Sequence, residues 1–247
     1  MKRIVETRDS VPQDSRLIVI DADRIPYLAA LLTDEADLDP NNIDGAVVHI
    51  LRKFHSQLNK HAGLSDIYAY CLSTKSFRHE LDADYKSNRR KMWQPPLRSY
   101  CEESFSTIVP TWQYPGYEAD DLVGILATAI PNCLIVSNDK DLNQIPGNHY
   151  DPQKNKLFTV TVDEARKQKY MQWIHGDSVD GIPGIPGIGP RKAEKFLDSL
   201  GFPDISEPEA TDHVRAWYKE CGKFEQPELY CELTRKMTWI LTDVLGA

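Results

Sequence analysis

The chain has 247 residues, of which 41% are hydrophobic and 27% are charged. This is an ordinary globular composition, and it excludes disordered and fibrous proteins. Lys and Arg total 29 against 37 Asp and Glu, so the formal net charge is -8. That balance alone disfavours a broadly basic nucleic-acid-binding protein. The length fits one large domain, or a domain with a small appendage.

Signals for membranes, secretion and bound thiolate metals are missing from the sequence. The longest apolar stretch, about residues 122–130, is far shorter than the ~20 residues that span a bilayer. The polar N-terminus has no signal-peptide core, and the five cysteines are scattered without a C-x-x-C pair. We therefore expect a soluble protein of a reducing cytoplasm.

The first 160 residues predict alternating strands and helices. A continuous apolar run that ends at Asp21 predicts a strand over 16–21. Asp39 and Pro40 are typical of the N-cap and first position of a helix, which apolar residues at helical spacing extend to about Leu58. Further strands are expected at 67–72, 107–114 and 133–137, with a helix at 118–130. This alternation predicts a parallel α/β sheet covered on both sides.

The remainder of the chain reads as helical. Thr161 is suited to cap a helix over 162–174, and a Gly/Pro-rich segment follows. Further helices are expected at about 190–200, 207–220 and 227–245. We accordingly divide the chain into an N-terminal extension (1–15), an α/β core (16–160) and a helical C-terminal part (161–247).

Residues 74–98 form a basic segment in an otherwise acidic chain. They hold seven Lys and Arg, three acids, and the aromatic residues Phe77, Tyr85 and Trp93. Cations interleaved with aromatic rings indicate contact with phosphates and stacked bases. A solvated loop with scattered charge is the alternative.

Carboxylates gather at the ends of predicted strands and at the starts of neighbouring segments. They are Asp21, Glu118, Asp120, Asp121, Asp139, Asp141, and the later pair Asp177 and Asp180. Their number equals the whole excess of negative charge. Sites in open α/β sheets form outside the carboxyl ends of strands, and oxygen ligands without Cys or His favour Mg²⁺ or Mn²⁺. For any single acid, a helix cap or a surface charge is the alternative.

The Gly/Pro segment 181–190 leads directly into an amphipathic helix. Gly187 and Gly189 permit a close backbone approach, and Pro190 fits the first helical position. Arg191 and Lys192 add cations to the free N–H groups of the helix start, which favours a DNA phosphate. A stiff linker is the alternative.

Five motifs occur in order between about residues 16 and 200: Asp21 after a strand, FRHELDADYKSNRR, YEADDLVGILA, VSNDKDLNQI and GDSVDGIPGIPGIGPRKA. This order resembles the 5′-nuclease superfamily of flap endonucleases and 5′→3′ exonucleases, especially its standalone bacterial or bacteriophage members. The resemblance implies a PIN-like parallel-sheet core, a helical arch at about 82–106, and a DNA-binding helix-three-turn-helix (helix-hairpin-helix) element at about 176–200. It also implies a cytoplasmic protein of a bacterial cell or a bacteriophage.

The resemblance assigns roles to individual residues. All eight acids above correspond to ligands of two metal ions, with Asp139 also catalytic. Lys86 and Arg89 correspond to catalytic cations beside the scissile phosphate. The positions that correspond to DNA contacts are Arg78, Tyr85, Lys86, Arg89, Arg90, Gly187, Gly189, Arg191, Lys192 and Lys195. The hairpin of the family can also hold K⁺ through main-chain carbonyls.

One position departs from the family pattern. Members commonly carry an Asp at the end of the second strand, where this chain has the uncharged Ser73. We expect a monomeric, Mg²⁺-dependent nuclease, with Mn²⁺ substituting, that acts near 5′ ends of duplex, flap or branched DNA and on RNA–DNA hybrids. The alternatives are a non-catalytic DNA-structure-binding protein, suggested by Ser73, and a PIN-type ribonuclease, which the Gly/Pro hairpin disfavours.

Overall fold

The computed structural model describes residues 15–33, 39–63, 65–91 and 93–243. All but the last residue of the expected N-terminal extension lies outside them. The chain divides into two compact units. The sheet unit comprises the described parts of Met1–Ser76, Trp93–Val160 and Leu241–Ala247, and the helical unit those of Phe77–Met92 and Thr161–Ile240.

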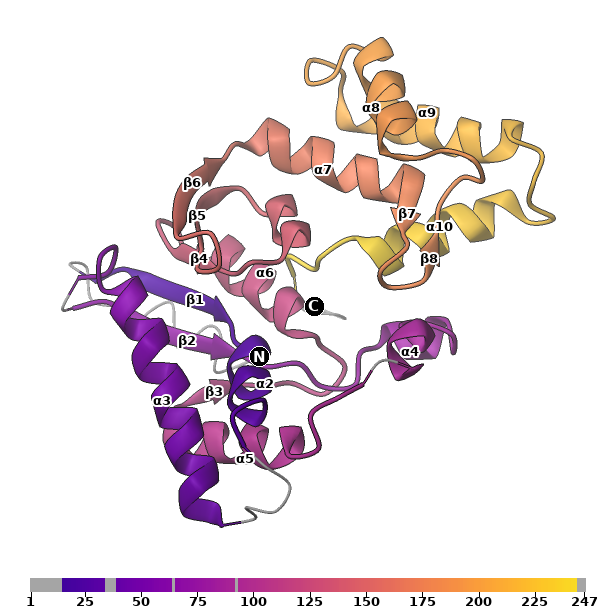
Figure 1. The fold of residues 1–247 in the computed structure, drawn as a ribbon. Coiled ribbons are helices and arrows are strands. Elements are labelled where there is room, and N and C mark those ends of the chain that lie inside the picture. The colour runs from indigo at the N-terminus through magenta and orange to yellow at the C-terminus, as the bar shows by residue number, and fades with distance from the viewer. Residues whose placement is uncertain (1–14, 34–38, 64, 92, 244–247) are drawn as a thin grey trace. The chain divides into compact units, whose positions relative to one another are not determined.

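The sheet unit is built on six strands in the order β3-β2-β1-β4-β5-β6 (Figure 1). They are β1 (Leu17–Asp21), β2 (Ile67–Cys71), β3 (Thr111–Trp112), β4 (Leu134–Val136), β5 (Gly147–Asp151) and β6 (Lys156–Val160). The first five strands pair in parallel, which confirms the predicted parallel sheet and adds β5 to its four predicted strands, and β6 joins antiparallel to β5. The chain runs outward from β1 to β3 and returns to β4 on the other side of β1. The strand order therefore reverses between β1 and β4, which is where α/β sheets place their sites.

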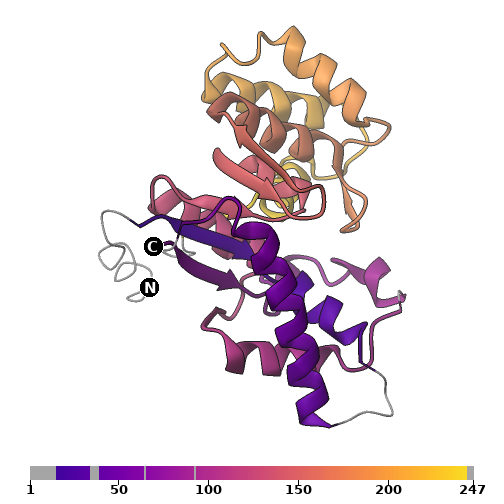
Figure 2. The ribbon, with the colours of Figure 1, turned by 60° about the vertical axis from the view of Figure 1, so that its left-hand side comes forward.

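Helices cover the sheet on both sides. Helices α2 (Arg24–Ala30), α3 (Pro40–Leu58) and α5 (Arg98–Ile108) pack together over the face that presents Ile18 and Ile20 (Figures 1 and 2). Helix α6 (Ala119–Ala129) packs against β1, β2 and β4. Asp39 caps α3 by accepting a hydrogen bond from the N–H of Asn41 at 2.9 Å, which confirms the predicted helix start.

Several predicted elements of this unit differ from those observed. The strand expected at 107–114 is reduced to β3, because α5 continues to Ile108. The same helix takes up much of the expected arch at 82–106, since Cys101 and Phe105, four residues apart, are fully buried in the core. Helix α2 and the β5–β6 hairpin were not predicted.

The helical unit contains α4 (Arg78–Leu81), the 3₁₀ helix η1 (Ser87–Lys91), α7 (Val162–His175), β7 (Gly176–Asp177), β8 (Ile182–Pro183), α8 (Pro190–Ser199), α9 (Glu207–Glu220) and α10 (Pro227–Thr238). Its core gathers Trp173, Leu197 and Tyr218 from successive helices, which lie together in Figure 2. The last helix is shorter than the expected 227–245. Residues 77–92, which the sequence placed with the α/β core, group with this unit instead.

Buried Arg78 explains that grouping. Its guanidinium donates to the carbonyl oxygens of Met237 at 3.0 Å and Trp239 at 2.9 Å. These carbonyls follow or end α10, where no helical N–H remains to satisfy them. The side chain thereby fastens α4 to the end of α10.

The β7–β8 hairpin between α7 and α8 depends on two glycines. Gly176 adopts φ +73°, and a Cβ on Gly184 would lie 2.2 Å from the carbonyl carbon of His175. Only hydrogen fits at these positions.

All five cysteines of the chain are free thiols. Among the described residues, no helix combines the length and hydrophobicity needed to cross a membrane.

Candidate metal centre

The carboxyl ends of β1 and β4 lie side by side and carry the first acids of the site. The Oγ of Ser137 donates to Oδ2 of Asp21 at 2.9 Å, and the N–H of Asp139 donates to the same Oγ at 2.9 Å. Asp139 in turn accepts from the N–H of Asp141 at 2.9 Å and so caps the 3₁₀ helix η2 (Lys140–Gln144). The sequence folds this way because both strands stop where the apolar run gives way to polar residues. Asp21, Asp139 and Asp141 therefore lie in one hydrogen-bonded network at the ends of β1 and β4, and their role as metal ligands stays a prediction.

The surroundings of Asp21 destabilise its ionised form. Burial, together with the negative charges of Asp23 and Asp139, raises its pKa from 3.8 to about 7, and the hydrogen bond from Ser137 acts in the opposite direction. A carboxylate that is desolvated and surrounded by like charge is costly to keep ionised. A bound cation removes both costs, so the residues present fit a cation site.

The first turn of α6 carries a second acidic group. One ligand oxygen from each of Glu118, Asp120 and Asp121 lies within 4.8 Å of the others. Asp121 is fully buried and accepts from the N–H of Glu118 at 3.4 Å and of Leu241 at 3.1 Å, and Asp120 accepts from the N–H of Asp121 at 2.7 Å. Helix N–H groups stabilise negative charge at this end. The set is all-oxygen, which suits Mg²⁺ or Mn²⁺ better than Zn²⁺.

Ser73 joins the two acidic groups. Its Oγ accepts from the N–H of Ala119 at 2.9 Å, at the start of α6. Its backbone N–H donates to Oδ1 of Asp23 at 2.8 Å, and its Oγ donates to Oδ2 of the same residue. The loop after β1 and the start of α6 are thus tied through the end of β2. Asp23 and Ser137 were not predicted to belong to the site; their position within two residues of Asp21 or Asp139 is the only signal for them in the sequence.

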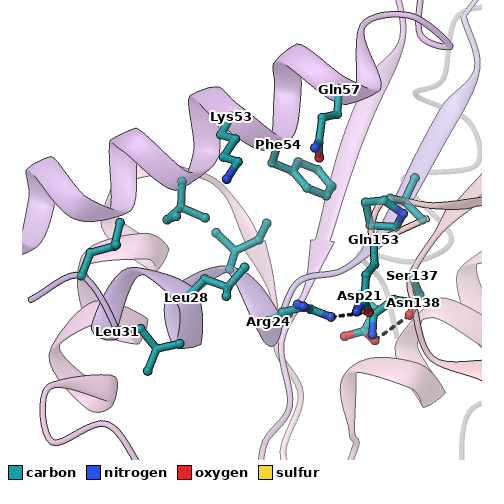
Figure 3. A pocket seen from close by; sticks show the side chains of 15 residues that line it. Asp21, Arg24, Leu28, Leu31, Lys53, Phe54, Gln57, Ser137, Asn138 and Gln153 are labelled. Atoms are coloured by element: carbon teal, nitrogen blue, oxygen red, sulfur yellow. Dashed lines mark hydrogen bonds between the residues drawn. The ribbon is translucent and has the colours of Figure 1, made fainter. Parts of the chain in front are cut away.

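A cavity of about 430 Å³ opens beside Asp21 (Figure 3). Leu28, Phe54 and other apolar side chains of α2 and α3 form most of its wall, and Arg24 closes one side by donating to Gln153 at 3.0 Å. Asp21 and Ser137 line the cavity. Asp21 is therefore reachable from this side although most of its surroundings are protein.

The other two predicted metal ligands belong to the helical unit. Asp177 is buried, and its Oδ1 accepts from the N–H of Val179 at 2.7 Å and of Asp180 at 3.4 Å, which stabilises the turn of the hairpin. Asp180 forms ion pairs with Arg89 and with Lys86, whose Nζ lies 3.4 Å from Oδ2. In this structure the pair serves a turn and an ion-pair network.

The predicted DNA-contacting residues divide by burial. Arg78 and Tyr85 are each 2% exposed, which contradicts the expected surface contacts. Arg78 binds carbonyl groups, and Tyr85 packs against Ile182 and Met237 while its hydroxyl donates to Asp180 at 3.3 Å. The side chain of Arg89 is 43% exposed. The side chain of Arg90 lies outside what the structure describes.

The start of α8 is open and free of acids. Gly187 adopts φ +77°, Gly189 is the N-cap, and Lys192 donates to the carbonyl of Gly187 at 3.0 Å. Arg191 and Lys195 are exposed, and the first turn holds no acidic residue. The predicted hairpin cations therefore surround a helix N-terminus suited to an anion.

The fold and the site together define the class: an α/β protein with a doubly wound sheet and a carboxylate site at the reversal of its strand order. The chain belongs to the family described as "5'-3' exonuclease, N-terminal resolvase-like domain", whose model matches residues 16–172. This confirms the resemblance to the 5′-nuclease superfamily.

Individual relatives support the same family assignment. The chain is 34% identical to DNA polymerase I of Rhizobium leguminosarum over 73% of its own length and 19% of that protein. It is 26% identical to a 5'-3' exonuclease of Aquifex aeolicus, with 81% of this chain and 72% of that protein covered. The fold resembles that of the bacteriophage T5 D15 flap endonuclease solved with DNA and metal ions, at TM-score 0.54 and 15% identity, covering 90% and 96% of the two chains. The chain spans less than a third of the DNA polymerase I relatives.

Proposed function

We propose that this chain is a divalent-metal-dependent 5′ nuclease that hydrolyses phosphodiester bonds near the 5′ ends of duplex, flap or branched DNA. The observation that carries the proposal is that Ser137 links the carboxylate of Asp21 to the backbone of Asp139 at the ends of β1 and β4, while Ser73, after β2, holds the start of α6, where Glu118, Asp120 and Asp121 stand. Family membership supports it, as do relatives named 5'-3' exonuclease.

The carboxylates have a defined task in this proposal. Asp21 and Asp139 would hold one ion, and Glu118 with Asp120 would hold its neighbour, while Ser137 keeps Asp21 oriented. When bound, Mg²⁺ ions supply Lewis-acid stabilisation of the departing oxygen and an activated water, and Mn²⁺ can take their place. Asp121 is a supporting group, because it is fully buried and already accepts two backbone N–H groups.

Lys86 and Arg89 remain our candidates for cations beside the scissile phosphate. Asp180 neutralises both in the structure, so a phosphate must displace this carboxylate to engage them. Charge placed on the phosphate stabilises the transition state more than the bound substrate. We also propose Asp177 and Asp180 as metal ligands, and release of Asp180 from its cations would free its carboxylate for that role.

We further propose that the segment from Gly187 to Lys195 binds the backbone of the duplex. The N-terminus of α8, the exposed Arg191 and Lys195, and the absence of acids in its first turn support a phosphate contact. Main-chain carbonyls of the same loop are the candidate site for K⁺.

A 5′-labelled flap substrate tests the proposal directly. We expect short 5′ products with Mg²⁺ or Mn²⁺ and no product in EDTA. Parallel RNA and RNA–DNA hybrid substrates separate the rival functions. Tight flap binding without product under either metal would establish a non-catalytic DNA-structure-binding protein, and preferred cleavage of RNA would establish a ribonuclease.

A further inference from the structure

Ser73 leaves the site with an apparent deficit of charge. The 5′-nuclease superfamily commonly has an Asp at the end of the second strand, and this chain has a hydroxyl there. A carboxylate from another part of the chain contacts Ser73. Asp23, in the turn after β1, directs both carboxylate oxygens at Ser73: Oδ1 accepts its backbone N–H at 2.8 Å and Oδ2 accepts its Oγ.

Asp23 has no other structural task that would explain this orientation. It stands at the N-cap of α2, a position where Asp ordinarily accepts a helix N–H, yet its side chain makes no capping hydrogen bond. Among the ion pairs of the described residues, none involves Asp23. The carboxylate of Asp23 is therefore stabilised neither by a helix N–H group nor by an ion pair with a described residue.

The turn also connects Asp23 directly to the metal centre. The backbone N–H of Asp23 donates to the carboxylate of Asp21. This hydrogen bond closes a short turn that holds both residues next to each other. A carboxylate offers about four acceptor positions, and Ser73 occupies two of those of Asp23. Two positions remain for a cation or for a water bound to it. Ser73, which also accepts from Ala119, fixes the direction in which they point.

We infer that Asp23 supplies to the metal centre the negative charge that the family carries at the end of the second strand, and that Ser73 is the residue that positions it. This inference rests on the proposed function. The carboxylate has moved from the end of β2 to the turn after β1, and the site keeps its charge although the family position is uncharged.

An exchange of the two side chains tests the inference. Mn²⁺ binding to the full chain, without DNA, is measured by electron paramagnetic resonance for Asp23→Ser, for Asp23→Asn, and for Asp23→Ser combined with Ser73→Asp. We expect either single variant to weaken Mn²⁺ binding by about 10- to 100-fold, the range for residues that support a metal. The exchanged variant should recover most of the affinity. Asp204→Ser, which removes one exposed acid of the helical unit, is the matched control and should bind as the wild type does.

The outcomes separate this inference from the proposed function. Circular dichroism in EDTA verifies that each variant folds, and Asp23→Asn, nearly isosteric, stands in if Asp23→Ser does not. Unchanged Mn²⁺ affinity in the folded single variants overturns the inference, as does an exchanged variant no better than Asp23→Ser. If Asp21→Asn weakens binding in either case, the proposed metal centre stands. Mn²⁺ binding that is indifferent to Asp21→Asn as well removes the proposed function itself.

Discussion

At the scale of single residues, the site sets function against stability. Asp21 ends β1, whose other four residues are buried, and neighbouring carboxylates oppose its ionisation. A neutral side chain at this position would favour folding more, because it would avoid both desolvation and repulsion. The conflict is understandable if a divalent ion completes the site.

This conflict predicts a pH-dependent gain in stability for Asp21→Asn. The pKa of Asp21 rises from 3.8 to about 7 on folding, so its favourable contribution is present below about pH 4 and is lost as the pH rises through 7. In EDTA at pH 8 we expect the variant to be more stable by about 1–3 kcal/mol. Thermal unfolding at pH 5 and pH 8 measures it. A difference that does not grow with pH would contradict the assigned cause.

Bound metal should make the wild type more stable than Asp21→Asn, the reverse of the order expected in EDTA. Saturating Mg²⁺ stabilises whichever folded protein binds it, by RT ln(1 + [L]/Kd). We expect the melting temperature of the wild type to rise with Mg²⁺ at pH 8 and that of Asp21→Asn to rise much less. An equal rise in both proteins would show that the ion binds elsewhere.

At the scale of elements, periodicity predicted those segments whose burial follows a simple pattern. The apolar run of β1, the helical stripe of α3 and the capped start of α7 are each visible in the sequence and present in the structure. Periodicity did not predict elements that bury few residues or that form only by pairing with neighbouring strands. Helix α5 buries only a few positions, and β5 (Gly147–Asp151) carries polar residues that become strand only by pairing with β4 and β6.

The packing of α5 gives a direct stability prediction. Phe105 is fully buried and its ring packs against that of Tyr70 in β2, so Phe105→Ala should destabilise the sheet unit by about 3–5 kcal/mol. Tyr100 on the same helix is 51% exposed, and Tyr100→Ala should change stability by less than about 0.5 kcal/mol. Urea titrations followed by circular dichroism compare the two. Similar midpoints for both variants would mean that α5 is not part of the core.

Helix α8 gives a prediction about DNA. Arg191→Ala with Lys195→Ala should weaken binding to flap and unbranched duplex alike, and should lower the slope of log affinity against log salt by about 1–2. Lys167→Ala is the matched control, because Glu194 and Asp198 already neutralise that cation. Binding titrations at several salt concentrations provide the slope. An unaltered slope would remove α8 from the duplex contact.

The candidate site was predicted unevenly, and for a physical reason. Acids at strand ends could be found because topology alone brings them to one edge of the sheet. The roles of Asp23 and Ser73 could not, since they depend on a contact across 50 residues. Arg78 shows the opposite error. Its positive charge in a basic segment predicted a contact with DNA, but the residue is buried and links two helical segments.

At the scale of the whole molecule, a net charge of -8 must be reconciled with the DNA substrate that we propose. Six of the eight predicted ligand acids lie in the sheet unit, at strand ends and at the start of α6, where the proposed divalent ions would offset their charge. The helical unit carries the cations of η1 and α8. Acidity concentrated at a metal centre is compatible with DNA binding, whereas the same acidity spread over the surface would oppose it.

We propose above all that these strand-end carboxylates hold the metal ions required for DNA cleavage. Cleavage and binding of one 5′-labelled flap by the wild type, Asp139→Asn and the control Asp204→Asn test it most directly, in Mg²⁺ for cleavage and in Ca²⁺ for binding. We expect Asp139→Asn to lose more than about 100-fold in cleavage rate while its flap affinity changes little, and Asp204→Asn to match the wild type. Wild-type cleavage by Asp139→Asn would contradict the account.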